Sequence, residues 1–220
     1  MQTEFFKNPH LRQGITIFLV LTSLLIFFSY WLQEEQPAVY NPSDLNPALV
    51  DQSLHNVEHN HKVAPFELIN QNGETITQED YNNTIYVTDF FFTRCPSICP
   101  VMTNNMGVLQ QEFIHNNDIK LLSISVTPEI DSVSVLYNYA SKNGAIDTKW
   151  NITTGNKKHI YELARKSYFA AVDDGDGGLQ DFIHTPNFVL VDKQKQIRGI
   201  YDGTKDDEIQ RLIKDIRTLQ

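Results

Sequence analysis

Two cysteines, Cys95 and Cys99, follow directly after a long apolar run, IYVTDFFF at positions 85–92. The run is rich in aromatic and β-branched residues and contains one charged residue, Asp89, which is typical of a central strand buried on both faces. Loops that leave such strands lie at one edge of the sheet, where α/β proteins build their sites. The sequence therefore predicts a sheet with this strand near its middle and the cysteines at the strand's exit.

Strands and helices alternate through the rest of this region, which predicts an α/β fold. The Asn72-Gly73 turn indicates a second strand early on, and Lys193-Gln194-Lys195 joins the last two strands as a hairpin. The pattern favours a central, mostly parallel sheet flanked by helices on both faces, closed by the hairpin and a helix. The predicted strands are 64–69, 85–92, 120–126, one near Ile152, 187–191 and 197–201, and the predicted helices are 101–114, 131–142, 156–167 and 206–219.

An uncharged segment, residues 14–32, lies near the amino terminus. As a helix it would be about 28 Å long, close to the hydrocarbon thickness of a bilayer. Lys7 and Arg12 precede it, so the positive-inside rule predicts a cytoplasmic tail over 1–13 and export of everything after Leu32. A cleaved signal peptide is the alternative, but no small-residue cleavage pattern follows the segment. We expect a retained single-pass anchor in a bacterial inner membrane, with the rest of the chain periplasmic.

Residues 33–61 form a predicted linker, because they contain Pro37, Pro42 and Pro47 and show no sustained hydrophobic period. Residues 62–220 form the predicted folded domain. The formal net charge of the chain is −9, and this sign disfavours binding to nucleic acid.

With two cysteines only, the chain cannot be a scaffold stapled by several disulfides. The small loop between Cys95 and Cys99 would gain little stability from a disulfide, since the entropic effect grows with loop length. Residues four apart near a helix start share one face, so both sulfurs can reach one ion. The helix amino terminus and Arg94 are expected to lower the thiol pKa values. Thiolates are soft ligands that prefer copper(I), and an imidazole can complete a three-coordinate site; a disulfide and a redox pair remain alternatives.

Among the seven histidines, His184 is the candidate third ligand. It lies in DFIHTP at positions 181–186, just before a predicted strand, where a loop can place an imidazole against the cysteines. A histidine that is merely hydrogen-bonded is the alternative. The other histidines are predicted to be solvated in the linker or on helix surfaces, or to precede the membrane segment: His10, His55, His59, His61, His115 and His159.

The stretch DFFFTRCPSICP at positions 89–100, followed by His184-Thr185, resembles the Sco/SenC family of cytochrome oxidase assembly proteins. The resemblance extends from about Val63 to the carboxyl end and includes the single amino-terminal anchor. It implies a thioredoxin-like fold and a copper ion held by Cys95, Cys99 and His184. It also implies a metallochaperone rather than an enzyme, acting on the dinuclear copper centre of cytochrome c oxidase subunit II or a related respiratory oxidase, with other copper chaperones as further partners.

The chain departs from the family pattern at Ile183, where an acidic residue often precedes the family histidine. Asp89 stands where thioredoxins carry a buried aspartate, and Pro186 falls close to the position of their cis-proline. These two residues favour redox chemistry, in which Asp89 would relay a proton to or from a thiol. A thiol-disulfide oxidoreductase that reduces the cysteines of the oxidase copper site is therefore the alternative function, although such enzymes usually carry two residues between their cysteines. A redox or copper sensor is a third reading.

Overall fold

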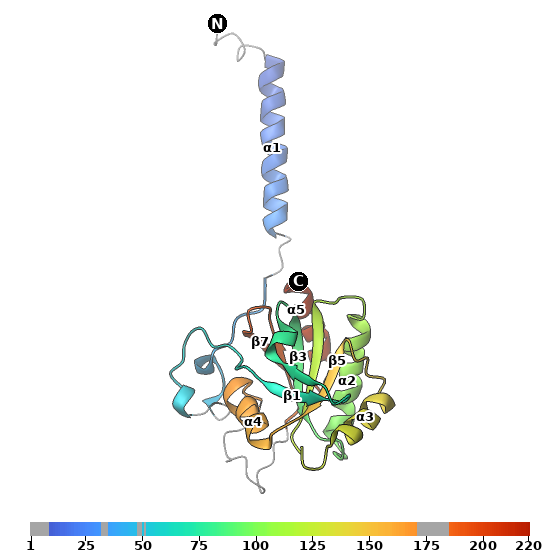
Figure 1. Cartoon of the computed structure of the whole chain (residues 1–220). Coiled ribbons are helices and arrows are strands. Elements are labelled where there is room, and N and C mark those ends of the chain that lie inside the picture. Colours follow the sequence, from blue (N-terminus) through green and yellow to red (C-terminus); the bar gives the residue numbers. More distant parts are fainter. Residues whose placement is uncertain (1–8, 32–34, 48–49, 51, 171–184) are drawn as a thin grey trace. The chain divides into compact units, whose positions relative to one another are not determined.

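The computed structural model describes residues 9–31, 35–47, 50, 52–170 and 185–220, and the chain divides into two units after Gln36 (Figure 1). The first unit contains one helix, α1 (Pro9–Trp31). It covers the described part of the predicted anchor, and its Pro9–Phe28 portion has a mean hydropathy of 1.9. This helix is long and apolar enough to cross a membrane, a property that a signal sequence would share.

The second unit is built on a seven-stranded sheet with the strand order β2-β1-β5-β4-β3-β6-β7. The strand predicted from the IYVTDFFF run, β3, is buried along its whole length and has four strands on one side and two on the other. The bounds of the strands are β1 (Glu67–Asn70), β2 (Thr75–Thr77), β3 (Ile85–Phe91), β4 (Ile119–Ser125), β5 (Trp150–Thr154), β6 (Asn187–Val191) and β7 (Ile197–Asp202).

The sheet is mixed, whereas the sequence predicted a mostly parallel one. Only β3, β4 and β5 run parallel to one another, and they are joined through helical crossovers. The outer pairs are antiparallel, including β3 with β6 and β1 with β5. The difference lies at the two ends of the sheet, where the antiparallel pairs β1–β2 and β6–β7 each join the parallel strands through a further antiparallel contact.

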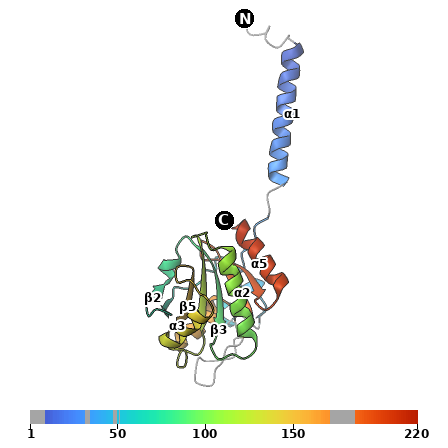
Figure 2. The same cartoon turned by 90° about the vertical axis from the view of Figure 1, so that its right-hand side faces the viewer.

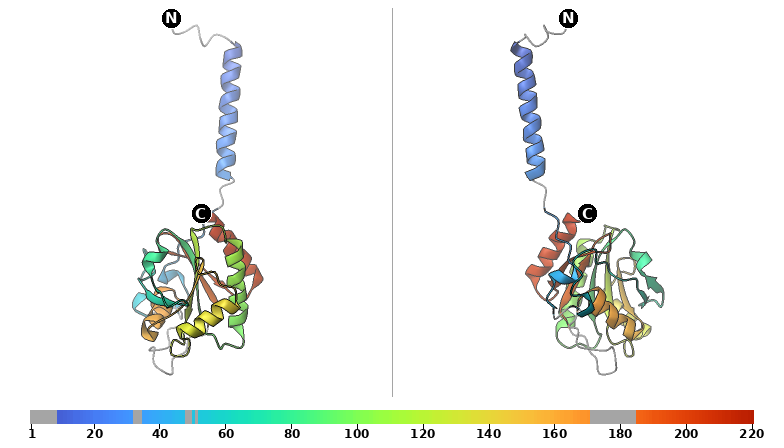
Figure 3. Two further views of the ribbon diagram at one scale, coloured as in Figure 1. Left: turned by 45° about the vertical axis from the view of Figure 1, so that its right-hand side comes forward. Right: turned by 90° about the vertical axis from the view of Figure 1, so that its left-hand side faces the viewer.

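Helices cover both faces of the sheet, as predicted. Figures 2 and 3 show α2, α3 and α5 together on one side, whereas α4 lies on the other. Each side has its own buried cluster, and the cluster under α2 and α5 contains both cysteines together with the fully buried Met102 and Met106. The helices are α2 (Ile98–Glu112), α3 (Val133–Lys142), α4 (Lys157–Glu162) and α5 (Asp206–Thr218).

Two helix ends differ from the predicted bounds for local reasons. Helix α2 begins before Pro100, which is tolerated because the first turn of a helix needs no partner for its amides. Asn156 caps α4 as predicted, accepting a hydrogen bond from the His159 amide at 3.1 Å. The predicted helix changes to a π-turn at Leu163–Ser167.

Much of the predicted linker, from Pro37 onward, is part of the second unit. Val50 is buried in the cluster beneath α4, and the Tyr40 amide donates to the Ile197 carbonyl at 2.8 Å. Arg198 donates through its Nε to the Pro37 carbonyl at 2.9 Å and through Nη1 to Asp192, also at 2.9 Å. These contacts attach the chain from Pro37 onward to the β6–β7 hairpin.

Candidate functional site

The cysteine segment, defined here as residues 92–97, runs from the end of β3 to the start of α2. Pro96 and Ser97 at its tip are exposed, but the side chain of Cys95 is 6% exposed and that of Cys99 is 3% exposed. Neither cysteine forms a disulfide, and the Cys99 amide donates to the Cys95 sulfur at 3.4 Å. The structure thus brings the two predicted sulfur ligands together at the amino terminus of α2, just below the surface.

Burial raises the pKa of the Cys99 thiol to about 12. The Phe92 backbone partly offsets this effect by hydrogen bonding, whereas the neighbouring Cys95 and Asp89 add to it. The prediction that the helix terminus and Arg94 lower the pKa of this thiol is wrong, because Cys99 lies inside the apolar cluster and Arg94 is exposed. Desolvation of a charge outweighs a dipole that acts partly through water.

Asp89 lies on the cysteine side of the sheet, since it shares one face of β3 with Val87 and Phe91, which belong to the same cluster as the cysteines. Its side chain is 1% exposed and accepts a hydrogen bond from Ser123 Oγ at 2.5 Å. Burial raises the pKa of this carboxyl to about 7, and the Ser123 hydrogen bond limits the rise. Asp89 is therefore a group that can gain or release a proton near neutral pH beside the cysteine pair.

Four further side chains on the cysteine side of the sheet had no predicted role: Ser123, Trp150, Thr103 and Tyr139. Trp150 Nε1 donates to Ser123 Oγ at 2.9 Å and completes a buried chain from the indole to Asp89. Tyr139 donates to or accepts from Thr103 Oγ1 at 2.6 Å, and the charges of Asp89 and both cysteines act on it. Burial, the largest cause, raises the pKa of Tyr139 to about 12. One feature of the sequence pointed to this network. Ser123 is a polar residue within the otherwise apolar, buried strand β4, and a buried hydroxyl needs a hydrogen-bond partner.

His184 lies outside the described residues, as do Asp181 and Ile183, so its proximity to the cysteines stays a prediction. The residues that follow are described. Pro186 accepts a hydrogen bond through its carbonyl from the Gly203 amide at 2.7 Å, and the Gly203 carbonyl accepts one from Asn105 Nδ2 at 2.8 Å. Asn105 belongs to α2, the helix that begins at the cysteines. The described chain contains no cis peptide bond, so Pro186 is not the counterpart of a thioredoxin cis-proline in conformation.

Replacing Gly203 with alanine should destabilise the domain. A Cβ atom there would lie 2.7 Å from the ring of Phe188, which is fully buried and cannot easily move. We expect the free energy of unfolding to fall by about 1–3 kcal/mol, the usual cost of overpacking. Chemical unfolding of the purified protein, followed by near-UV circular dichroism, measures this change.

Gly107→Ala is the matched control for Gly203→Ala. Gly107 lies in α2, and a Cβ there would meet no atom within 4 Å. This substitution should raise the free energy of unfolding by about 0.5–1 kcal/mol, because alanine loses less backbone entropy in a helix. Equal stabilities for the two variants would contradict the steric argument.

The other histidines do not join the cysteines. His55 Nε2 lies 2.8 Å from the Val50 carbonyl oxygen, and His61 Nε2 lies 2.9 Å from that of Ser167. Within the part of the chain that the structure describes, no three His, Cys, Asp or Glu side chains are grouped so that they could hold a metal ion. His184, the predicted third ligand, is not among the described residues, so this role stays a prediction.

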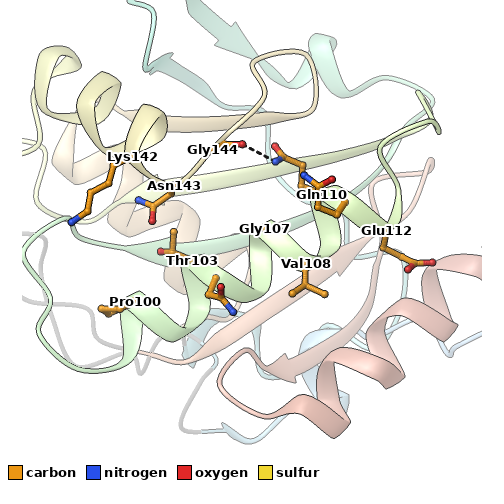
Figure 4. Close-up of a pocket in the computed structure, with 11 residues that line it drawn as sticks. Pro100, Thr103, Gly107, Val108, Gln110, Glu112, Lys142, Asn143 and Gly144 are labelled. Atoms are coloured by element: carbon orange, nitrogen blue, oxygen red, sulfur yellow. Dashed lines mark hydrogen bonds between the residues drawn. The ribbon is translucent and has the colours of Figure 1, made fainter.

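A groove of about 1040 Å³ lies beside the cysteine helix but has different chemistry (Figure 4). It runs between α2 and the end of α3 and starts at Pro100, directly after Cys99. Neither cysteine lines it, and amide side chains such as Asn104 and Asn143 are prominent in its wall. The groove offers hydrogen-bonding groups and no soft metal ligand, so the candidate site is the cysteine pair.

Comparison with known proteins gives consistent matches. A family model described as SCO1/SenC matches residues 55–220. The SCO1 protein homolog of Bacillus subtilis is 32% identical over 161 residues, which cover 72% of this chain and 83% of that protein. BsSco, described as a member of the Sco family of cytochrome c oxidase assembly proteins with a disulfide switch, has a solved structure that is 31% identical. It matches with a TM-score of 0.62, over 73% of this chain and 94% of that one.

A more distant match concerns the fold alone. ScoI from Bradyrhizobium japonicum, solved with copper bound, is 23% identical and has a TM-score of 0.56, over 72% of this chain and 99% of that one.

Proposed function

Because the chain belongs to the SCO1/SenC family, with the thioredoxin-like fold of Sco proteins, we propose that it is a membrane-anchored copper-binding assembly factor. In this proposal Cys95, Cys99 and His184 hold the copper ion. The protein delivers copper to, or prepares, the dinuclear centre of cytochrome c oxidase subunit II. The observation that carries the proposal is the pair of adjacent, buried thiols, not joined in a disulfide, at the exit of the central strand.

The chemistry of this pair suits copper(I). Soft sulfur ligands select this ion, and the apolar surroundings of the cysteines exclude water that would compete for it. The raised pKa of Cys99 means that the thiol carries its proton in the apo protein at neutral pH. Copper has to displace that proton, so binding should release protons and strengthen as the pH rises. Asp89 is the buried group placed to accept a proton on this side of the sheet.

His184 is the proposed third ligand because of its place in the chain. It stands two residues before Pro186, which is tied through Gly203 to Asn105 on the cysteine helix. This connection supports an entry of the histidine segment on the cysteine side of the sheet. A neutral imidazole beside two thiolates makes a three-coordinate set that copper(I) accepts.

Helix α1 supports the proposed location of the protein. Its apolar surface suits the lipid of a bacterial inner membrane, and Lys7 and Arg12 favour a cytoplasmic tail over residues 1–13. In this arrangement the anchor is 14–32 and the metal-binding domain is periplasmic. The anchor keeps the domain beside a membrane-bound oxidase and raises its effective concentration there.

Copper(I) titration of the reduced full chain in detergent, in competition with a chelator of known affinity, tests the proposal. We expect one tightly bound copper per chain. His184→Ala should weaken binding at least roughly 10–100-fold, the range for loss of a ligand's supporting partner. His115→Ala, which changes an exposed histidine, should bind as tightly as the wild type. A wild-type chain that binds no copper, or a His184 variant that binds normally, would contradict the assigned ligand set.

A thiol-disulfide oxidoreductase is the second candidate function, and Asp89 is the observation that favours it. A buried carboxyl with a pKa raised to about 7 beside a dithiol can move the proton that disulfide exchange requires. BsSco is described as containing a disulfide switch. The two functions separate in His184→Ala, because disulfide exchange needs no third ligand. Full support of oxidase assembly by this variant in cells would favour the reductase.

A further inference from the structure

Asp131, between β4 and α3, is a fully buried carboxylate with an unusual number of hydrogen-bond donors around it. Its side chain accepts four hydrogen bonds, three from hydroxyl groups and one from a backbone amide. It contacts neither cysteine in these bonds and was assigned no role by the sequence pattern. Burying a carboxylate is costly, so its retention here with a complete set of donors calls for a structural reason.

Two of the four bonds come from Thr93, which lies two residues before Cys95. The Thr93 amide donates to Oδ2 at 3.1 Å, and Thr93 Oγ1 donates to Oδ1 at 2.6 Å. Because each carboxylate oxygen takes one of these donors, both the position and the orientation of Thr93 are defined. Hydrogen bonds to an ionised acceptor are stronger than neutral ones.

The other two bonds hold Asp131 to the end of β4. Ser125 Oγ donates to Oδ2 at 2.6 Å, and Thr127 Oγ1 donates to the same atom at 3.0 Å. Ser125 is paired with Phe91, the last residue of β3, and the Val126 amide donates to the Phe91 carbonyl at 2.9 Å. The carboxylate therefore cross-links the exits of two adjacent parallel strands, and one of these exits is the cysteine segment.

We propose that Asp131 is a positioning residue for the metal site. It holds the cysteine segment through Thr93, so that Cys95 occupies its place against the Cys99 amide before any metal arrives. A ligand segment that is ordered in advance avoids the entropic cost of being fixed on binding. The role in metal binding rests on the proposed function, but the ordering of Cys95 does not.

Thr93→Val tests the link that reaches the cysteine segment. It removes the hydroxyl donor and keeps both the backbone bond and the side-chain shape, while Thr93→Ser keeps the hydroxyl and is the conservative rescue. Asp131→Asn removes the charge and one acceptor. Ser134→Ala is the control, since Ser134 bonds to Ser132 in the same region and not to Asp131. All variants are made in the full chain and compared at a temperature where near-UV circular dichroism shows each to be folded.

Two readouts separate positioning from general stability. In chelator competition, Asp131→Asn and Thr93→Val should bind copper(I) roughly 10–100-fold more weakly, as expected for partners behind a metal ligand. In the metal-free chain, iodoacetamide should modify the thiols about tenfold faster in the same variants, because the segment opens more often. Thr93→Ser and Ser134→Ala should match the wild type in both assays.

The outcomes distinguish the inference from the proposed function. A wild-type chain without tight copper would end the proposed function, and the alkylation rates would still test the positioning role. Tight copper in the wild type together with unchanged affinity and unchanged alkylation in Thr93→Val and Asp131→Asn would overturn the inference. The inference would also be overturned if Thr93→Ser bound copper as weakly, and was alkylated as fast, as Thr93→Val. The Thr93 hydroxyl would then not be the contact that positions the segment.

Discussion

Replacing either Cys95 or Cys99 with serine should remove tight copper(I) binding from the chain. A serine hydroxyl is a hard, neutral donor and does not replace a thiolate. Loss of a partner that only supports a ligand typically weakens metal binding by roughly 10–100-fold. Loss of a ligand itself should therefore weaken it by more than about 100-fold. Copper stoichiometry and chelator competition on the reduced full chain measure the effect.

Met102→Leu is the matched control for the cysteine variants. Met102 is the next sulfur-containing residue after Cys99 on the same helix and is fully buried in the same cluster, and leucine conserves its volume. We expect this variant to bind copper as the wild type does. If a single serine variant kept wild-type affinity, the two cysteines would not act as joint ligands. If Met102→Leu lost copper, the ligand set would have to include the thioether.

Asp89→Asn should raise the free energy of unfolding of the reduced, metal-free protein at pH 8. The difference from the wild type should be larger at pH 8 than at pH 4. The pKa of Asp89 is raised from 3.8 to about 7 by burial, so the native state keeps its proton where the unfolded state releases it. The contribution of protonated Asp89 to the free energy of unfolding is therefore fully present below about pH 4 and is lost as the pH rises through 7. The difference at pH 8 should approach about 4 kcal/mol, at about 1.4 kcal/mol per pKa unit.

Unfolding of both proteins at several pH values between 4 and 8 measures this difference. Asparagine imitates the neutral carboxyl and can still accept the hydrogen bond from Ser123. Cys99, with its pKa raised to about 12, does not titrate in this range. Parallel profiles for wild type and Asp89→Asn would show that Asp89 does not titrate near neutral pH.

The same substitution bears on the choice between the two proposed functions. Asp89→Asn keeps both thiols and removes the proton acceptor beside them. A metal carrier with this change would still bind copper, whereas a reductase would lose the group that moves the proton. The variant thus complements His184→Ala, which removes a metal ligand and leaves the thiols and Asp89 in place.

Local patterns in the sequence determined the elements that carry the cysteines. The apolar run at 85–92 gave β3 within one residue, and the cysteines lie at its exit as predicted. The apolar helix at the amino terminus and the alternation of strands and helices were equally evident. All of these rest on residues that are neighbours in the chain, where hydrophobic periodicity is a direct signal. The stretch DFFFTRCPSICP with His184-Thr185 resembles the SCO1/SenC family, and the family model that matches residues 55–220 confirmed this membership. The position of His184 in space stays a prediction.

Tertiary structure alone decided the environment of the site. Asp89, Ser123 and Trp150 come from three different strands, and Thr93 meets Asp131 across the ends of two of them. The depth at which Cys99 is buried reversed the predicted direction of its pKa shift. The antiparallel pairs β1–β5 and β3–β6 likewise join strands that are far apart in the chain. Desolvation and hydrogen bonding between distant segments depend on how the chain packs. Patterns among neighbouring residues do not show this packing, so they could not predict these effects.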